Sequence, residues 1–270
     1  MPSAFVSKTW QGKWALVTGA SSGIGEAIAV ELAAAGVNLI LTARRQDRLE
    51  ALAERLRGST PSIRTQVIVA DLAQEAAPQQ IFDSTEGAGI EVDLLVNNAG
   101  FGDYGEFLRS DVDRHVEMVQ VNCSAVVHLT RLFLPRMVER RHGDVMIVSS
   151  MAAYQPVAYL ATYAATKAFD RLLAEALAEE VRRYGVRVSA LCPGPTKSEF
   201  SHVAGGREDE NRSYQSAQEV ALAGLEGLAK GHPWVIPYFG GRFQIFAQRL
   251  APRRMVSRAV ERMFRPAGLH

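Results

Sequence analysis

Short apolar runs alternate with longer segments of helical periodicity from residue 14 to residue 192, and this alternation limits the fold more than any other feature. The runs cover residues 14–18, 37–42, 66–69, 93–96, 145–149 and 186–191, and a further one covers residues 234–236. Strand–helix–strand repeats predict parallel strands joined by crossover helices. We therefore expect an α/β fold, a doubly wound parallel sheet of about seven strands with helices on both faces. Ligands of such sheets bind at the carboxyl ends of the strands.

A glycine-rich turn, GASSGIG at residues 19–25, joins the first apolar run to the first helical segment. Glycines there allow a tight turn and let backbone N–H groups approach a pyrophosphate at the helix N-terminus. The glycine spacing differs from the general G-x-G-x-x-G pattern, but the strand–turn–helix context is the one that pattern requires. The alternative is a glycine-rich connection without a ligand.

The second strand ends without the acidic residue that would bind the ribose of NAD, because Ala43 takes that position and Arg44 and Arg45 follow. Guanidinium groups suit a 2′-phosphate, so the sequence favours NADP(H) over NAD(H). The alternative is that both arginines cap the next helix. Asp71 follows the third strand, where it could meet an adenine amino group or cap a helix.

A tyrosine and a lysine stand four residues apart, as Tyr163 and Lys167, at the start of a helical segment. This spacing places both side chains on one helix face. A nearby cation favours the phenolate, so Tyr163 could exchange protons nearer neutral pH than free tyrosine does. Ser150 follows a buried strand and could polarise a substrate oxygen. Asn122 is a polar residue in an apolar helix, with either structural bonds or a place in a water chain.

Taken together, these motifs resemble the short-chain dehydrogenase/reductases over about residues 12–240, a family with a Rossmann-type sheet. The resemblance implies that Asn122, Ser150, Tyr163 and Lys167 form a catalytic tetrad in which Tyr163 exchanges a proton with a carbonyl or alcohol. It also implies a homodimer or homotetramer through the helices of residues 111–138 and 162–183. The motifs and the resemblance name these cofactor-binding residues: Gly19, Ser21, Ser22, Gly23, Ile24, Gly25, Arg44, Arg45, Asp71, Leu72, Asn98, Ala99, Gly100, Tyr163, Lys167, Pro193, Gly194 and Thr196.

Less regular segments are expected to select the substrate. Residues 195–217 carry many charges and two adjacent glycines, which is typical of a lid. The expected pocket wall is apolar and aromatic, and it favours a hydrophobic ketone or acyl chain over a sugar. Its residues are Phe101, Met151, Tyr154, Tyr159 and Phe200. For each of them the alternative is packing between lid and core. The sequences of these segments are similar to those of an NADP-preferring branch of carbonyl and ketoacyl reductases.

The chain divides into one domain at residues 1–240 and a basic extension at residues 241–270. Seven arginines and a single acid, Glu261, give this extension a charge of +6, since 7 − 1 = 6. Apolar residues recur at helical spacing between the arginines, which predicts an amphipathic helix. Such a helix can make peripheral membrane contact, pack on its own domain or bind a partner subunit.

The composition limits partners and location. The whole chain has a net charge of +1, which argues against nucleic acid as a partner. Neither the spacing nor the clustering of His and Cys predicts a metal site. Two isolated cysteines and the lack of an apolar leader predict a cytoplasmic protein. The protein would be membrane-peripheral if the C-terminal extension binds lipid. The leading function is an NADPH-dependent carbonyl reductase. Two alternatives are an NAD(P)-dependent alcohol dehydrogenase acting oxidatively and a non-catalytic NADP-binding regulatory protein.

Overall fold

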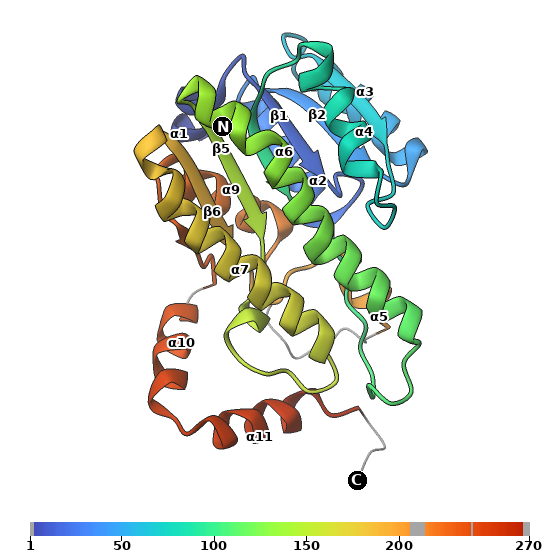
Figure 1. Cartoon of the computed structure of the whole chain (residues 1–270), viewed down its shortest axis with the longest axis vertical. Helices are drawn as coiled ribbons and strands as arrows, with labels where there is room; N and C mark the ends of the chain where they lie inside the picture. Colours follow the sequence, from blue (N-terminus) through green and yellow to red (C-terminus); the bar gives the residue numbers. More distant parts are fainter. Residues whose placement is uncertain (1–2, 206–213, 239, 267–270) are drawn as a thin grey trace.

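The computed structural model describes residues 3–205, 214–238 and 240–266. Its centre is one parallel sheet of seven strands in the order β3-β2-β1-β4-β5-β6-β7 (Figure 1). The strands are β1 (Trp14–Thr18), β2 (Asn38–Ala43), β3 (Thr65–Val69), β4 (Val92–Asn97), β5 (Gly143–Val148), β6 (Val186–Leu191) and β7 (Trp234–Val235). The order reverses between β1 and β4, so the predicted doubly wound sheet is confirmed.

Helices cover both faces of the sheet, since successive residues of each strand point to opposite sides. In β1, Val17 packs with the helices of one face and Leu16 with those of the other. The first face carries α1 (Ala4–Trp10), α2 (Gly23–Ala34), α3 (Gln46–Ser59) and α9 (Ala217–Ala229). The second carries α4 (Ala77–Asp83), α6 (Ala125–Arg140) and α7 (Ala161–Val181), with α5 (Val112–Val119) ahead of α6. Short helical turns lie at Glu86–Ala88, Met151–Tyr154 and Arg182–Tyr184.

Helix α1 has no counterpart in the sequence prediction. It is held by Trp10, which is fully buried and donates from Nε1 to Asp144 Oδ2 at 2.7 Å. Arg187 pairs with the same carboxylate at 2.6 and 2.8 Å. A buried carboxylate needs such partners, so this contact ties the N-terminus to the start of β5 and β6.

The sequence predicts one long helix over residues 111–138, and the structure differs there. Helices α5 and α6 are joined by a π-helical turn at Gln120–Ser124, which contains Asn122. A π turn widens the helix by one residue and is frequent at functional sites. It turns the Asn122 side chain toward the sheet, where it is fully buried.

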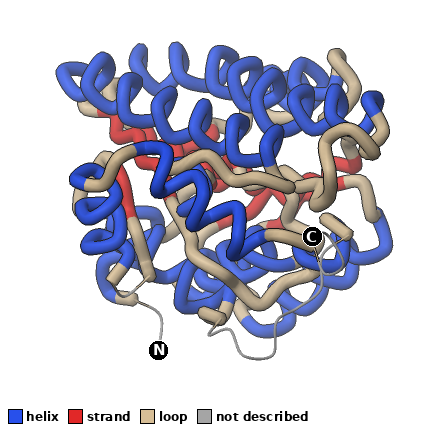
Figure 2. Tube along the Cα trace, turned by 90° about the horizontal axis from the view of Figure 1, so that it is seen from below, coloured by secondary structure: helices blue, strands red, loops and turns tan. Residues whose placement is uncertain are grey.

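The expected C-terminal extension is helical over its described part. Helices α10 (Gly241–Leu250) and α11 (Arg253–Phe264) follow β7 and extend past the carboxyl ends of the strands (Figure 1). Figure 2 views the molecule from below, the side toward which these helices extend in Figure 1. Val256, Val260 and Phe264 of α11 pack against Val157 and Ala164 of the main sheet domain. Residues 267–270 of the expected extension lie outside the described residues.

Candidate active site

The ends of β1 and β4 are joined directly at the carboxyl edge of the sheet. Thr18 Oγ1 donates to Val96 O at 3.2 Å and accepts from the backbone N–H groups of Asn98 and Ala99, both at 2.9 Å. Asn98 Nδ2 donates to Thr18 O at 2.8 Å. The expected cofactor residues after β4 are therefore locked to the glycine turn after β1.

The glycine turn forms a cradle that only residues without a side chain can form. Gly19 and Gly23 have positive φ angles of 65° and 61°, a region that glycine enters without strain. A Cβ on Gly25 would lie 2.4 Å from both Gly19 O and Asn98 Nδ2. Helix α2 starts at Gly23, and the Ser22 side chain makes no capping bond to it. The first N–H groups of α2 thus face the turn, an arrangement that suits an anionic phosphate.

The two predicted arginines have different surroundings. Arg45 lies on the glycine turn and donates to Ser21 Oγ at 3.0 Å and to Ser22 Oγ at 2.8 Å. Arg44 is largely exposed, with Nη1 3.6 Å from Glu117 Oε1. Only Arg45 is therefore fixed beside the cradle.

Glu199 is a residue of this site that the sequence does not single out. Its carboxylate pairs with Arg45 at 2.9 Å and with Arg48 at 2.6 Å, and hydrogen bonds from Arg48 and Arg45 lower its pKa to about 2. It precedes the short helix α8 (Phe200–Val203) in the segment expected to form the lid. Arg45 and Glu199 are 154 positions apart in the chain, so no local sequence pattern predicts this ion pair.

Asp71 caps a turn. Its Oδ1 accepts from Ala73 N at 3.1 Å, while helix α4 begins only at Ala77 with Ala76 as its N-cap. The alternative of a helix N-cap is therefore wrong. Leu72 is buried in the core beneath this turn.

Ser150, Tyr163 and Lys167 meet where β5 ends and α7 begins. Ser150 Oγ accepts from Ala152 N at 3.1 Å, which fixes the hydroxyl at the start of a short turn. Lys167 is 5% exposed, and its Nζ donates to Val148 O at 2.8 Å. Burial raises the pKa of Tyr163, while Lys167 and the Ser150 hydroxyl lower it. The net direction is upward, so the expected depression is outweighed and Tyr163 keeps its proton at neutral pH.

The Asn122 side chain is engaged in structural bonds. Its Oδ1 accepts from Phe101 N at 3.1 Å, and its Nδ2 donates to Phe101 O and to Thr166 Oγ1, both at 3.0 Å. These bonds connect the segment after β4 to the turn of α7 that carries Lys167. Both amide hydrogens are used, so a water at this residue would have to donate to an acceptor such as the second lone pair of Oδ1. Gly100 lies against the same group, since a Cβ on it would be 3.0 Å from Asn122 Oδ1.

The segment after β6 closes the same edge. Pro193 O accepts from Met151 N at 2.8 Å, which joins it to the turn after Ser150. Thr196 Oγ1 donates to Gly194 O at 3.0 Å, and Thr196 pairs with Gln215 in an isolated bridge. Residues 206–213 of the expected lid lie outside the described residues.

The five expected wall residues divide into two groups. The Phe200 ring lies 5.0 Å from the Tyr163 ring, Met151 is buried, and the Phe101 ring lies under Arg114. The other two point their hydroxyls elsewhere. Tyr154 donates to Cys192 Sγ at 3.7 Å, and Tyr159 donates to Glu261 of α11 at 2.9 Å. Phe200 is therefore the wall residue that contacts the catalytic candidates.

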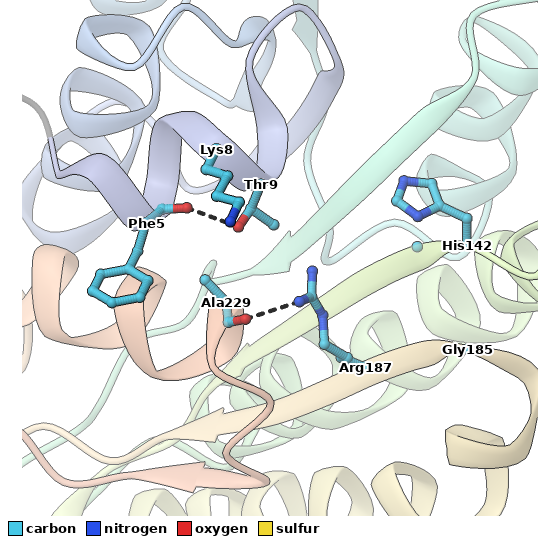
Figure 3. A pocket seen from close by; sticks show the side chains of 8 residues that line it. Phe5, Lys8, Thr9, His142, Gly185, Arg187 and Ala229 are labelled. Atoms are coloured by element: carbon cyan, nitrogen blue, oxygen red, sulfur yellow. Dashed lines mark hydrogen bonds between the residues drawn. The ribbon is translucent and has the colours of Figure 1, made fainter.

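A hollow of about 510 Å³ lies at the opposite, amino edge of the sheet (Figure 3). Phe5, Thr9, His142 and Arg187 line it, and none of the site residues expected from the sequence does. The Arg187 guanidinium is already committed to Asp144 and to Ala229 O at 2.9 Å. The chemistry described above therefore lies away from this hollow.

A parallel sheet with a glycine cradle, and with serine, tyrosine and lysine side chains at its carboxyl edge, defines the class of dinucleotide-binding α/β oxidoreductases. The family model described as short chain dehydrogenase matches residues 13–209. The chain belongs to this family, and the resemblance predicted from the motifs is confirmed.

Named relatives are similar over most of the chain. Very-long-chain 3-oxoacyl-CoA reductase of Bos taurus is 36% identical over 190 residues, which are 68% of this chain and 59% of the relative. A short-chain dehydrogenase from Sphingobium yanoikuyae, solved in complex with NADPH, is 27% identical with a TM-score of 0.81, covering 96% of this chain and 98% of that one. The bulky-bulky ketone specific alcohol dehydrogenase from Comamonas testosteroni is 28% identical with a TM-score of 0.76, covering 96% of both chains.

Proposed function

We propose that the chain is an NADPH-dependent oxidoreductase that transfers hydride between the nicotinamide and a carbonyl or secondary alcohol of a hydrophobic small molecule. The observation that carries this proposal is the placement of Ser150, Tyr163 and Lys167 beside the glycine cradle at one edge of the sheet. The relatives support it, because they are named as reductases and dehydrogenases.

The cradle fits a dinucleotide phosphate, and the Arg45 guanidinium on Ser21 and Ser22 fits a 2′-phosphate. The residues proposed to hold NADP(H) are the glycine turn with Arg45, the segment Asn98 to Gly100, Tyr163 and Lys167, and the turn at Pro193, Gly194 and Thr196. Arg44 remains available from its exposed position, and Asp71 and Leu72 shape the adenine side. When bound, the cofactor supplies or accepts the hydride.

The protein's own residues handle the proton and the substrate oxygen. Tyr163 keeps its proton at neutral pH and donates it to the oxygen that becomes the alcohol. The Ser150 hydroxyl donates a hydrogen bond to the same oxygen. The Lys167 ammonium stabilises the phenolate left on Tyr163, which is proposed to be reprotonated through water held at the Asn122 turn.

A hydrophobic substrate fits this proposal, since the Phe200 ring supplies apolar surface 5.0 Å from the Tyr163 ring. Very-long-chain 3-oxoacyl-CoA and bulky ketones, named for two of the relatives, are the compounds to screen first.

The test is Tyr163→Phe in the full chain. We expect turnover of NADPH with a panel of hydrophobic ketones in the parent and its loss in the variant, with NADPH binding retained. Turnover by Tyr163→Phe would contradict the proton-transfer role. Preference for NADH and alcohols would instead support the oxidative dehydrogenase. NADPH binding with no turnover on any ketone or alcohol would support the regulatory protein.

We also propose that the chain forms a homo-oligomer through α5 and α7. Val112, Val116 and Val119 of α5 and Phe169 and Leu172 of α7 are exposed apolar side chains on these two helices. Light scattering of the purified protein is expected to give a dimer or tetramer, and a monomer would refute this proposal.

A membrane-peripheral location is proposed for helix α10. Phe243, Phe246 and Leu250 are exposed on it, and Arg242 and Arg249 add positive charge. Among the described helices, none is long and apolar enough to cross a membrane. Co-sedimentation with anionic vesicles and its loss in Phe243→Ser/Phe246→Ser would support this proposal. Absence of sedimentation would refute it.

A further inference from the structure

A third ionisable residue lies on the helix stripe that carries Tyr163 and Lys167. Asp170 stands three residues after Lys167 and seven after Tyr163, which places all three on one face of α7. It is fully buried, and its Oδ2 accepts from Lys167 Nζ at 2.9 Å. Asp170 belongs to none of the motifs considered above.

The ionisable groups around the Asp170 carboxylate indicate its role. Lys167 is the ion-pair partner found for Asp170 among the described residues. The other titratable groups that act on this pair are Tyr163 on the same helix and the Cys123 thiol of the π turn. Burial raises the pKa of the Cys123 thiol to about 12, so it is neutral near pH 7. Burial raises the pKa of the Asp170 carboxyl, and the Lys167 ammonium 2.9 Å away opposes this rise. With this pair ionised, two opposite charges and two neutral groups fill the buried stripe, and its net charge is zero.

Burial and Asp170 act on Lys167 in opposite directions. Desolvation lowers the pKa of the Lys167 ammonium, the Asp170 carboxylate raises it, and the net direction is upward. Asp170 also raises the pKa of Tyr163. The second donor bond of Lys167, to Val148 O at 2.8 Å, holds the ammonium between the end of β5 and the carboxylate.

We infer that Asp170 is a positioning residue, which holds Lys167 beside Tyr163 and balances the lysine charge, and so decides over which pH range Tyr163 holds its proton. This inference rests on the proposed function for its catalytic meaning. Asp170 itself exchanges no proton with substrate, since the proton passes between Tyr163 and the substrate oxygen.

The sign of the effect follows from the charge balance. With Asp170 ionised, loss of the Tyr163 proton leaves the buried stripe with one negative charge. Without that carboxylate, the same loss converts a buried stripe of one positive charge into a neutral one. Deprotonation is therefore easier in a variant that lacks the charge, and its midpoint falls. A charge within about 4–6 Å shifts such midpoints by about 1 to 3 pH units, and Asp170 stands about 10 Å along the helix from Tyr163, so a smaller shift of up to about 1 pH unit is expected.

The test is Asp170→Asn in the full chain, read by tyrosinate absorbance as the pH is raised. The difference between each protein and its own Tyr163→Phe version isolates the Tyr163 midpoint without any turnover. We expect the midpoint to fall by up to about 1 pH unit in Asp170→Asn, and the alkaline limb of ketone reduction to move with it. Asp170→Glu restores the carboxylate and should return the midpoint toward the parent value. Glu179→Gln, an exposed residue of the same helix, is the control without a shift.

An unchanged midpoint in folded Asp170→Asn overturns the inference, whatever happens to the rate. If that variant does not fold, Asp170→Ser removes the same charge and carries the same prediction. Absence of turnover in the parent would refute the proposed function, while the absorbance midpoint would still decide the role of Asp170.

Discussion

Gly25→Ala tests whether the glycine cradle is as tight as its geometry indicates. The added Cβ would lie 2.4 Å from Gly19 O and 2.4 Å from Asn98 Nδ2, both below any normal contact distance. The backbone of the turn must move to relieve the contact with Gly19 O, and the Asn98 side chain must move as well. Moving the side chain breaks the hydrogen bond from Asn98 Nδ2 to Thr18 O, which is 2.8 Å long.

The magnitude follows from three effects. Overpacking of a tight site costs about 1–3 kcal/mol. One lost hydrogen bond costs about 1 kcal/mol more. Alanine regains about 1 kcal/mol over glycine through its higher helix propensity, because Gly25 belongs to α2. We therefore expect a net loss of about 1–3 kcal/mol of unfolding free energy. That loss lowers the thermal midpoint by roughly 2–10 °C in a chain of this size.

The matched control is Gly58→Ala in α3, where an added Cβ meets nothing within 4 Å. It should leave stability unchanged or raise it by about 0.5–1 kcal/mol. Calorimetric unfolding and NADPH titration are run on both variants. We expect Gly25→Ala to weaken NADPH binding at least about tenfold, since displaced amides no longer face the phosphate. Equal thermal midpoints and equal NADPH affinities for the two variants would refute the cradle argument.

Three further predictions concern Glu199, the two cysteines and the contact between α11 and the main domain. Glu199→Gln frees Arg45 and should tighten NADPH binding roughly twofold to fivefold without changing NADH binding, as measured by nicotinamide fluorescence. The ion pairs lower the pKa of Glu199 to about 2 from its ordinary 4.5, so they should persist at neutral pH and be lost as the pH falls from 4.5 toward 2. Proteolysis of the expected lid segment should therefore become faster over this pH range in the parent. The Gln variant should lack this change. The Cys123 and Cys192 thiols, whose pKa values burial raises to about 12 and about 11, should resist alkylation at pH 8 until the protein is unfolded, and fast modification of the native protein would contradict their burial. Val260→Asp places a charge in the contact between α11 and the main domain, so α11 should become protease-sensitive; an unchanged digestion pattern would show that this contact does not hold the helix.

Local sequence patterns predicted most of the fold and the placement of the site. The apolar runs predicted where the strands begin and end, because buried parallel strands are largely apolar. For β1 and β6 the predicted bounds agree with the structure to the residue. The order of strand and helix implied the doubly wound sheet, which placed the glycine turn and Ser150 at one edge. Tyr163 and Lys167 needed only the helix period to share a face.

Helix α1 and the π turn could not be predicted in the same way. The seven residues of α1 show no clear periodicity. The helix is held in place by the hydrogen bond from Trp10 to the buried carboxylate of Asp144, 134 positions away. The π turn at Asn122 breaks a helix whose sequence period continues across it. Its geometry is fixed by bonds to Phe101 and Thr166, which approach only in the folded chain.

The sequence by itself determined the family and picked out the residues to which we assign proton exchange, because these depend on spacings of a few residues within one element. Only the tertiary structure decided which charges face those residues. Glu199 reaches Arg45 from a segment 154 positions away. Asp170 acts on Lys167 only because both are removed from water. Electrostatic interactions depend on distance and burial, and neither quantity is written in the local order of residues.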